Sequence, residues 1–259
     1  MPDRIRLDGR VAVVTGAAGV IGCAAMRLLA ERGARIVAID RSQQDLQTAI
    51  RDLPASAQAL AVTADVTRED EVAGYVHAAV DKFGTIDVFH NNAGVEGDVT
   101  PITRYPLQAF RRVIDVNVVG VFLGMKHVLP VMLKQNKGSI INTASIAGLT
   151  GATEIAAYTA SKHAVIGLTK SAALECTATG VRVNCVCPGL IDSRMLSAII
   201  EGRNPAKAPV ANDKIVERIP ARRLGQPSEV ASIVAFLASD EASYVSGSAY
   251  TVDGGRTAG

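Results

Sequence analysis

Short apolar runs alternate along the chain with longer stretches in which apolar residues recur at helical spacing. The apolar runs predict seven strands, at residues 11–15, 35–39, 59–63, 86–90, 138–143, 181–186 and 249–252. The helical spacing predicts helices at residues 21–32, 69–83, 110–133 and 157–175. Because the strands are continuously apolar and the connections between them are helical, we expect a parallel sheet covered by helices on both faces.

The region from 192 to 220 departs from this alternation. It contains Gly202, Asn204 and three prolines, and it is longer than an ordinary connection between a strand and a helix. Segments of this kind often cover binding sites, so we expect a substrate lid here. Its apolar residues fit either such a lid or an ordinary amphipathic helix, and they are Met195, Leu196, Ile199 and Ile200.

The 259 residues contain no linker or internal repeat, which predicts one doubly wound α/β domain spanning residues 1–259. The composition, 48% hydrophobic and 20% charged, is that of an ordinary globular protein. The net charge of +2 comes from scattered basic residues, so we expect no nucleic acid partner. We also expect no membrane partner, because the first residues lack a signal-peptide core and Lys126, His127 and Pro130 interrupt the most apolar stretch.

The cysteines show neither the spacing of a zinc site nor that of a disulfide framework. Cys185 and Cys187 lie two residues apart in an apolar run, where alternation puts both on one face of a strand. We therefore expect reduced structural thiols at all four positions, which are Cys23, Cys176, Cys185 and Cys187. This usage predicts a cytoplasmic protein with no metal site.

Tyr158 and Lys162 carry the most distinctive chemistry of the chain. They are four residues apart, so both project from one face of the predicted helix. A phenol can give or take a proton, a neighbouring ammonium favours the phenolate, and the Ser145 hydroxyl can hold a substrate oxygen. The combination predicts a proton-transfer site, although a tyrosine and a lysine at this spacing also occur by chance on solvated helices.

A glycine-rich loop joins the first strand to the first helix, with glycines at positions 16, 19 and 22. Such a loop lets the backbone approach a pyrophosphate at the helix N-terminus, although it also suits a plain strand–helix turn. Asp40 ends the second strand and can accept hydrogen bonds from an adenosine ribose while repelling a 2′-phosphate. We therefore expect NAD rather than NADP, with Arg41, which can accommodate a 2′-phosphate, as the counter-argument.

These features together resemble the short-chain dehydrogenase/reductase family, in its single-domain branch, over nearly the whole chain. The markers occur in the family's order and are the loop at 15–22, Asp65-Val66, Asn91-Asn92-Ala93-Gly94, Asn117, Ser145, Tyr158-x-x-x-Lys162, Pro188-Gly189 and residues 252–255. The resemblance implies a three-layer, doubly wound Rossmann fold with a central seven-stranded parallel sheet. It also implies a nicotinamide cofactor, which we expect to be NAD.

The resemblance assigns roles to a catalytic tetrad. Tyr158 would act as acid/base on the substrate oxygen, and Ser145 would orient that oxygen. Lys162 would contact the nicotinamide ribose and favour the phenolate, and Asn117 would hold a water that links Lys162 to solvent. The implied cofactor-binding residues are Gly16, Gly19, Val20, Ile21, Gly22, Asp40, Arg41, Asp65, Val66, Asn92, Ala93, Gly94, Tyr158, Lys162, Pro188, Gly189, Ile191 and Ser193. The candidates for the substrate pocket are Glu96, Ala147, Glu154 and Met195.

Three positions depart from the usual pattern of the family. Val20 stands where single-domain members usually carry a glycine, and we interpret it as a local variation that moves the turn glycine to Gly19. Ser193 replaces a commoner threonine and keeps the hydroxyl. His90 stands where apolar residues are frequent, and we expect a strand histidine whose hydrogen bonds are satisfied.

The residues and the resemblance together predict an NAD(H)-dependent oxidoreductase that interconverts a small secondary alcohol and a ketone. Three alternatives stay open: an NADPH-linked 3-oxoacyl thioester reductase, a nucleotide-sugar epimerase or dehydratase, and a non-catalytic NAD-binding protein. Residues 91–97 and 242–245 are most similar to NAD-linked members that act on cyclic or hydrophobic ketones, levodione reductases among them. The resemblance also implies a homotetramer, assembled through helices near 105–133 and 157–176 and the last strand.

Overall fold

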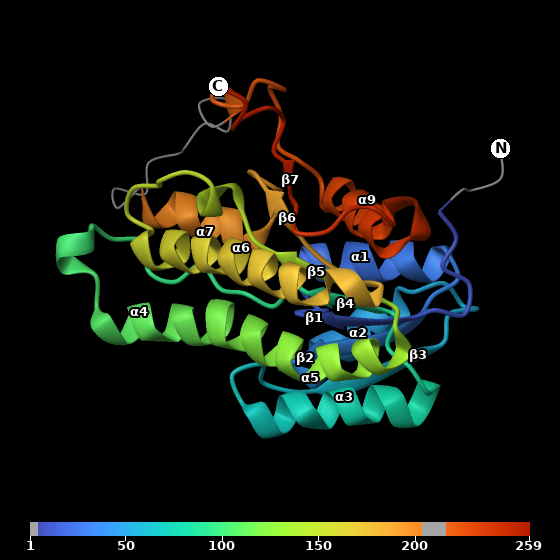
Figure 1. Ribbon diagram of the computed structural model, residues 1–259. Coiled ribbons are helices and arrows are strands. Elements are labelled where there is room, and N and C mark those ends of the chain that lie inside the picture. The colour runs from blue at the N-terminus through green and yellow to red at the C-terminus, as the bar shows by residue number, and fades with distance from the viewer. Residues whose placement is uncertain (1–4, 204–215) are drawn as a thin grey trace.

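The computed structural model describes residues 5–203 and 216–259, and a parallel sheet of seven strands runs through its centre (Figure 1). The strand order across the sheet is β3-β2-β1-β4-β5-β6-β7. The strands are β1 (Val11–Thr15), β2 (Arg35–Asp40), β3 (Ala59–Thr63), β4 (Val88–Asn91), β5 (Gly138–Thr143), β6 (Val181–Pro188) and β7 (Ala249–Val252). The predicted seven-stranded parallel sheet is therefore confirmed.

Helices cover both faces of the sheet, as the alternating pattern predicts (Figure 1). One face carries α1 (Val20–Glu31), α2 (Gln43–Arg51) and α9 (Pro227–Ala238). The other carries α3 (Glu69–Phe83), α5 (Gly120–Gln135) and α6 (Ala156–Cys176). The remaining elements are α4 (Leu107–Ile114), the π-helical turn η2 (Asp115–Val119), α7 (Arg194–Gly202) and the short 3₁₀ turns η1 (Ile102–Arg104), η3 (Ile146–Gly148), η4 (Thr177–Thr179) and η5 (Asp240–Ala242). Residues 204–215 of the expected lid lie outside the described residues.

Local capping explains two helices that periodicity does not predict. At the start of α2, the Ser42 hydroxyl accepts a hydrogen bond from the Asp45 backbone N–H at 3.2 Å. At the start of α9, the Glu229 carboxylate accepts one from the Gln226 backbone N–H at 2.8 Å, and Pro227 occupies the first turn. These bonds pair backbone donors that a helix start leaves open, so both helices begin at defined residues.

The predicted helix at 110–133 is longer than expected and interrupted. It begins as α4, passes through one π-helical turn at Asp115–Val119, and continues as α5. By length and composition alone, Leu107–Gln135 is apolar enough to cross a membrane, a criterion that core helices also meet. In this structure 44% of its most apolar window is buried.

Two apolar cores lie on opposite faces of the sheet, because successive strand residues point to opposite sides. Val13 of β1 and Phe89 of β4 are paired in register and pack on the face of α3, α5 and α6. Their neighbours Ala12 and Val88 are also paired and pack on the face of α1, α2 and α9. This parallel register brings the carboxyl ends of all the strands to one edge of the sheet, where α/β proteins bind ligands.

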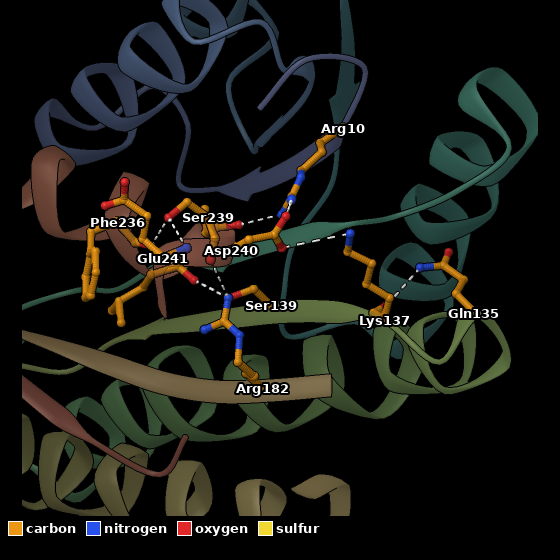
Figure 2. A network of polar contacts seen from close by, with 11 residues as sticks. Arg10, Gln135, Lys137, Ser139, Arg182, Phe236, Ser239, Asp240 and Glu241 are labelled. Atoms are coloured by element: carbon orange, nitrogen blue, oxygen red, sulfur yellow. Dashed lines mark hydrogen bonds and ion pairs between the residues drawn. The ribbon is translucent and has the colours of Figure 1, made fainter. Parts of the chain in front are cut away.

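The opposite edge is closed by a network of polar contacts (Figure 2). Arg182, at the start of β6, donates hydrogen bonds to the carbonyls of Leu237 and Ser239 at 2.7 and 3.0 Å. Arg10, just before β1, forms an ion pair with Asp240. These contacts join the amino ends of β1 and β6 to the end of α9, on the side of the sheet away from the strands' carboxyl ends.

The cysteines are free, as the sequence predicts, and three of them are buried. Cys185 and Cys187 both belong to the apolar core on the α6 side of β6, which agrees with the predicted alternation. Across the described residues, no group of three His, Cys, Asp or Glu side chains is placed to hold a metal ion.

Candidate active site

A cavity of about 990 Å³ opens at the carboxyl ends of the strands. It is lined by residues from the glycine loop, from the ends of β2, β4, β5 and β6, and from α6 and α7. All the predicted cofactor-binding residues except Gly22 line it. Of the predicted tetrad, Ser145, Tyr158 and Lys162 line the cavity and Asn117 does not. The structure thus brings residues that are far apart in the sequence into one site.

The glycine loop has the geometry of a cradle. Gly16 has a φ of +62°, and a Cβ placed there would lie 2.9 Å from the Cα of Ala93. A Cβ on Gly22 would lie 2.2 Å from the Gly16 carbonyl oxygen, so this glycine lets α1 approach the loop. Gly19 has an ordinary φ of −73°. The expectation that Gly19 is the turn glycine is therefore wrong: Gly16 is the residue in the left-handed conformation.

Asp40 closes the loop against the end of β2. Its two carboxylate oxygens accept hydrogen bonds from the backbone N–H groups of Ala18, at 3.0 Å, and Arg41, at 2.8 Å. Asp40 and Arg41 both line the cavity beside Asp65. The combination of a glycine cradle, an open helix N-terminus and a strand-end carboxylate fits a dinucleotide.

Asp65 is partly a structural cap. One carboxylate oxygen accepts hydrogen bonds from the backbone N–H and the hydroxyl of Thr67, at 2.9 and 2.8 Å. Burial acts to raise the pKa of Asp65, but the Thr67 hydrogen bonds and the charges of Arg41 and Arg68 outweigh it and lower the pKa. The ionised carboxylate caps the loop and also lines the cavity beside Asp40 and Arg41.

Tyr158 lies in the wall of the cavity, and only 8% of its surface is exposed. Burial raises the pKa of its phenol to about 12, and the neighbouring Ser145 hydroxyl acts in the opposite direction. Ser145 begins the turn after β5, where its oxygen accepts a hydrogen bond from the Ala147 backbone N–H at 3.2 Å. The Tyr158 and Ser145 hydroxyls therefore lie close together in the same cavity, one on α6 and the other at the end of β5.

Lys162 lies one turn after Tyr158 on α6 and is 3% exposed. Its Nζ donates a hydrogen bond to the Thr143 carbonyl at 2.8 Å and lies 5.5 Å from the centre of the Tyr158 ring. Burial lowers the pKa of Lys162 to about 8. The ammonium is thus close enough to the phenol to favour its ionised form.

Asn117 lies in the π-helical turn, a rare feature that frequently marks functional sites. Its side-chain oxygen accepts a hydrogen bond from the Val95 N–H at 2.8 Å. Its amide nitrogen donates to the Val95 carbonyl at 2.9 Å and to the Ser161 hydroxyl at 3.0 Å. The side chain therefore holds the loop after β4, and it places Gly94 between itself and Lys162.

His90 differs from its expectation. Its Nε2 lies 3.0 Å from the Thr143 hydroxyl, but its buried Nδ1 has no hydrogen-bond partner among the residues that the structure describes. Thr143 donates to the side-chain oxygen of Asn92, whose amide nitrogen donates to the carbonyls of Thr15 and Gly16. Because the single Thr143 proton is used on Asn92, His90 must donate through Nε2 and keep Nδ1 unprotonated. The sequence alone did not predict this chain of contacts. The one sequence feature that could have indicated it is a histidine within an apolar strand.

The four candidates for the substrate pocket divide into two pairs. Ala147 and Met195 line the cavity, while Glu96 and Glu154 do not. Instead, each glutamate forms an ion pair with a cavity-lining arginine, one at the first residue of α7 and one directly after its last. The pairs are Arg194–Glu96, at 3.3 Å, and Arg203–Glu154, at 3.8 Å.

The helix α7 covers the end of the cavity beside Tyr158. Its Met195 and Ile199 pack on an apolar cluster formed by Ala147, Ile155 and Tyr158. Four apolar residues of this helix line the cavity, and they are Met195, Leu196, Ile199 and Ile200. These residues therefore belong to an amphipathic helix that also forms a wall of the cavity, while their action as a lid stays a prediction.

Comparison with known proteins shows relatives that match this chain over almost the whole of both sequences. A family model described as enoyl-(acyl carrier protein) reductase matches residues 16–257. Levodione reductase of Leifsonia aquatica is 37% identical, over 98% of this chain and 96% of its own. Cyclohexanol dehydrogenase of Acinetobacter sp. (strain SE19) is 40% identical, over 97% and 96%. Cis-4-hydroxycyclohexanecarboxylate dehydrogenase of Sinomonas cyclohexanicum is 43% identical, over 96% and 97%.

Solved structures agree with this chain over almost its whole length. The crystal structure of levodione reductase matches with a TM-score of 0.95 at 37% identity, covering 98% of this chain and 99% of that one. An NAD+-bound xylitol dehydrogenase matches with a TM-score of 0.91 at 37% identity, covering 96% and 99%. An actinorhodin polyketide ketoreductase with NADPH matches with a TM-score of 0.91 at 36% identity, covering 95% and 97%.

Proposed function

Because this chain belongs to the short-chain dehydrogenase/reductase family, we propose that it interconverts a secondary alcohol and a ketone with NAD(H). The observation that carries the proposal is the placement of Tyr158, Lys162 and Ser145 in one cavity with the glycine loop. The relatives named for levodione and cyclohexanol support a small alcohol or ketone as the substrate.

The chain's own residues handle the proton. The Ser145 hydroxyl holds the substrate oxygen, and Tyr158 removes the hydroxyl proton during oxidation or returns it during reduction. Because burial holds the pKa of Tyr158 at about 12, the reaction needs the positive charge of Lys162 beside the phenol. A nicotinamide bound in the cavity would accept or supply the hydride at the carbinol carbon.

The replacement of Tyr158 by phenylalanine tests this proposal directly. Tyr158→Phe removes the group that transfers the proton but keeps the ring that packs against Ala147 and Ile155. We expect kcat to fall by at least about 10²-fold, the usual contribution of a positioned acid/base, while NADH still binds. Steady-state rates and titration of NADH fluorescence measure the two effects. Full activity of the variant would contradict the mechanism.

We further propose NAD as the cofactor, because the Asp40 carboxylate occupies the end of β2 and lines the cavity. A carboxylate there repels a 2′-phosphate, and Arg41 on its own attracts one. We expect kcat/KM to be higher with NAD+ than with NADP+, and Asp40→Ala to reduce or reverse this preference. Equal values of kcat/KM for the two cofactors in the unchanged protein would contradict the role of Asp40.

A second candidate function is reduction of a 3-oxoacyl thioester with NADPH. The description of the matching family model and the similarity to a ketoreductase crystallised with NADPH favour it. A clear preference for NADP(H) together with turnover of 3-hydroxyacyl thioesters would replace the first proposal by this one.

We also propose that the protein is a cytoplasmic homotetramer. Four large apolar side chains are open to solvent: Leu107 of α4, Val119 of η2, Phe122 of α5 and Leu174 of α6. Burying such surfaces between copies would stabilise an assembly. The free thiols support a reducing compartment. Native mass spectrometry tests the assembly, and a monomer at micromolar concentration would contradict it.

A further inference from the structure

The end of the cavity beside α7 carries two arginines, each paired with a glutamate. Arg194 pairs with Glu96 and Arg203 with Glu154, and in both pairs the arginine lines the cavity while the glutamate does not. The Arg194 side chain is 80% exposed, whereas that of Arg203 is 38% exposed. Solvent screens Arg203 less, so its charge has the larger effect on a bound ligand.

The guanidinium of Arg203 is held in place from two sides. Its Nη2 donates to the Thr153 carbonyl at 2.8 Å, and its Nε lies 3.8 Å from the Glu154 carboxylate. Within residues 5–203 and 216–259, its Nη1 has no partner. A guanidinium fixed in this way presents a positive charge and planar N–H donors to the cavity, and such a group recognises a carboxylate.

The charged side chains that line the cavity leave it with a net positive charge. Arg218 and Arg256 also line the cavity, and neither forms an ion pair with a carboxylate in the part of the chain that the structure describes. Among the described residues, six cationic side chains line the cavity against three carboxylates, those of Asp40, Asp45 and Asp65, so its net charge stays positive even when Glu96 and Glu154 are counted against Arg194 and Arg203. An anionic group is favoured over a cationic one in such a site.

The rest of this end of the cavity is apolar. Ala147 and Ile155 form a surface next to Tyr158, and Met195 and Ile199 of α7 close over it. A ligand that fits both features has an apolar body beside the Tyr158 hydroxyl and an anionic group at its far end. It is therefore a hydroxylated hydrocarbon acid rather than a polyol.

We propose that the substrate is a secondary alcohol whose apolar body carries a carboxylate, and that Arg203 binds this carboxylate. The inference rests on the proposed oxidoreductase function and names the substrate class of that same site. Arg203 is a specificity residue in this scheme and takes no part in proton transfer. Glu154 holds the guanidinium but also weakens its attraction for an anion.

A purely structural role for the Arg203–Glu154 ion pair predicts the opposite effect of Glu154→Gln on carboxylate substrates. If Arg203 and Glu154 served only to fasten α7 over the cavity, Arg203→Met and Glu154→Gln would both impair every substrate. If Arg203 binds a carboxylate, Glu154→Gln removes a competing negative charge and improves the binding of anionic substrates. The two variants then change carboxylate turnover in opposite directions.

The test compares cis-4-hydroxycyclohexanecarboxylate with its methyl ester, each oxidised with NAD+ by the full-length protein. The ester has the same ring and hydroxyl but no charge. We expect the unchanged protein to favour the acid by about tenfold in kcat/KM, as one charge-assisted hydrogen bond allows. Arg203→Met is expected to abolish that preference with the ester unaffected, and Glu154→Gln to raise it about twofold.

A binding measurement separates this inference from the proposed function. Cyclohexanecarboxylate and its amide are titrated against the protein with NADH bound, read by NADH fluorescence. Binding of the acid but not the amide, lost in Arg203→Met, supports the inference even if no alcohol is oxidised. A failure to oxidise any alcohol would overturn the proposed function alone. Oxidation of acid and ester at equal kcat/KM leaves the function standing and overturns the inference. An equal loss on both substrates in Arg203→Met, or a raised KM for NAD+, also overturns it.

Discussion

Burial shifts the proton affinities of Tyr158 and Lys162 in opposite directions. It raises the pKa of the phenol to about 12 and lowers the pKa of the ammonium to about 8. Both shifts favour the uncharged side chain, because each charged form loses its hydration in the cavity wall. The phenol therefore stays protonated near neutral pH unless a positive charge lies beside it, and the protonated form of Lys162 supplies that charge.

The lowered pKa of Lys162 predicts a pH dependence of stability in the cofactor-free protein. Between pH 8 and 10 the unfolded lysine, with an ordinary pKa of 10.5, holds its proton while the folded one releases it. The unfolded state then binds more protons, so the free energy of unfolding rises with pH, by up to about 1.4 kcal/mol per pH unit. Tyr158 acts in the opposite direction only above pH 10, where the unfolded phenol ionises first.

Urea unfolding of the unchanged protein and of Lys162→Met at pH 8, 9 and 10 measures this effect. Other titrating groups contribute to both proteins and cancel in the difference. We expect the difference in the free energy of unfolding between the two proteins to change with pH across this range. A constant difference would mean that Lys162 titrates in the folded state as it does in water.

The residues that carry the chemistry could be identified from the sequence, but their partners could not. Tyr158 and Lys162 share a helix face because of their spacing alone. The contact of His90 with Thr143, by contrast, depends on the register between β4 and β5 and on which face each side chain takes. The ion pairs of Glu96 and Glu154 depend equally on where α7 packs, which no local pattern encodes.

At the scale of elements, the strands were predictable and two helices were not. Each strand is a short apolar run bounded by turn residues, which a sheet covered on both faces requires. The helix α9 is apolar almost all round, so it has no periodic polar face to indicate a helix. The helix α2 spans only nine residues, and its start depends on the Ser42 cap rather than on a long pattern.

The glycine loop and the helix α3 offer a matched pair of glycine substitutions. Gly16→Ala forces a side chain into a left-handed conformation, with a Cβ 2.9 Å from Ala93. Gly74, inside α3, has nothing within 4 Å of the corresponding position. We expect Gly16→Ala to lower the free energy of unfolding by about 1–2 kcal/mol or more and to weaken NADH binding at least about tenfold. Gly74→Ala should raise the free energy of unfolding by about 0.5–1 kcal/mol and leave NADH binding unchanged.

Denaturant unfolding and NADH fluorescence measure the effects of both glycine substitutions. The two variants add the same methyl group, so a difference between them reports the conformation of the loop rather than the added volume. Wild-type affinity for NADH in Gly16→Ala would show that the loop does not approach the cofactor.

Over the whole molecule, the carboxyl and amino ends of the strands carry different features. The carboxyl edge holds the cavity, while the amino edge holds the network around Arg182 and Asp240 (Figure 2). Arg182 is largely buried and donates hydrogen bonds to the backbone carbonyls of Leu237, Ser239 and Val245, whereas the Asp240 side chain is 71% exposed. The stability of the fold and the chemistry of the site should therefore respond separately to substitution.

Two substitutions in this network test the separation. Arg182→Met removes the hydrogen bonds that the guanidinium donates to the carbonyls of Leu237 and Ser239, and it is expected to lower the free energy of unfolding by about 1–3 kcal/mol. Asp240→Ala breaks an exposed ion pair and should change it by less than about 1 kcal/mol. Neither variant should change kcat or KM at a temperature where it remains folded. A fall in kcat/KM for Arg182→Met would show that the amino edge influences the active site.

The thiols of Cys185 and Cys187 give β6 a built-in reporter of its own opening. Both are inaccessible to solvent in a strand that has neighbours on each side, so a thiol reagent can react with them only when the sheet separates there. Cys23, which is partly exposed on α1, should be labelled early without any such opening. The labelling rate of the two strand thiols, followed by mass spectrometry in native buffer, therefore measures how often the centre of this protein comes apart.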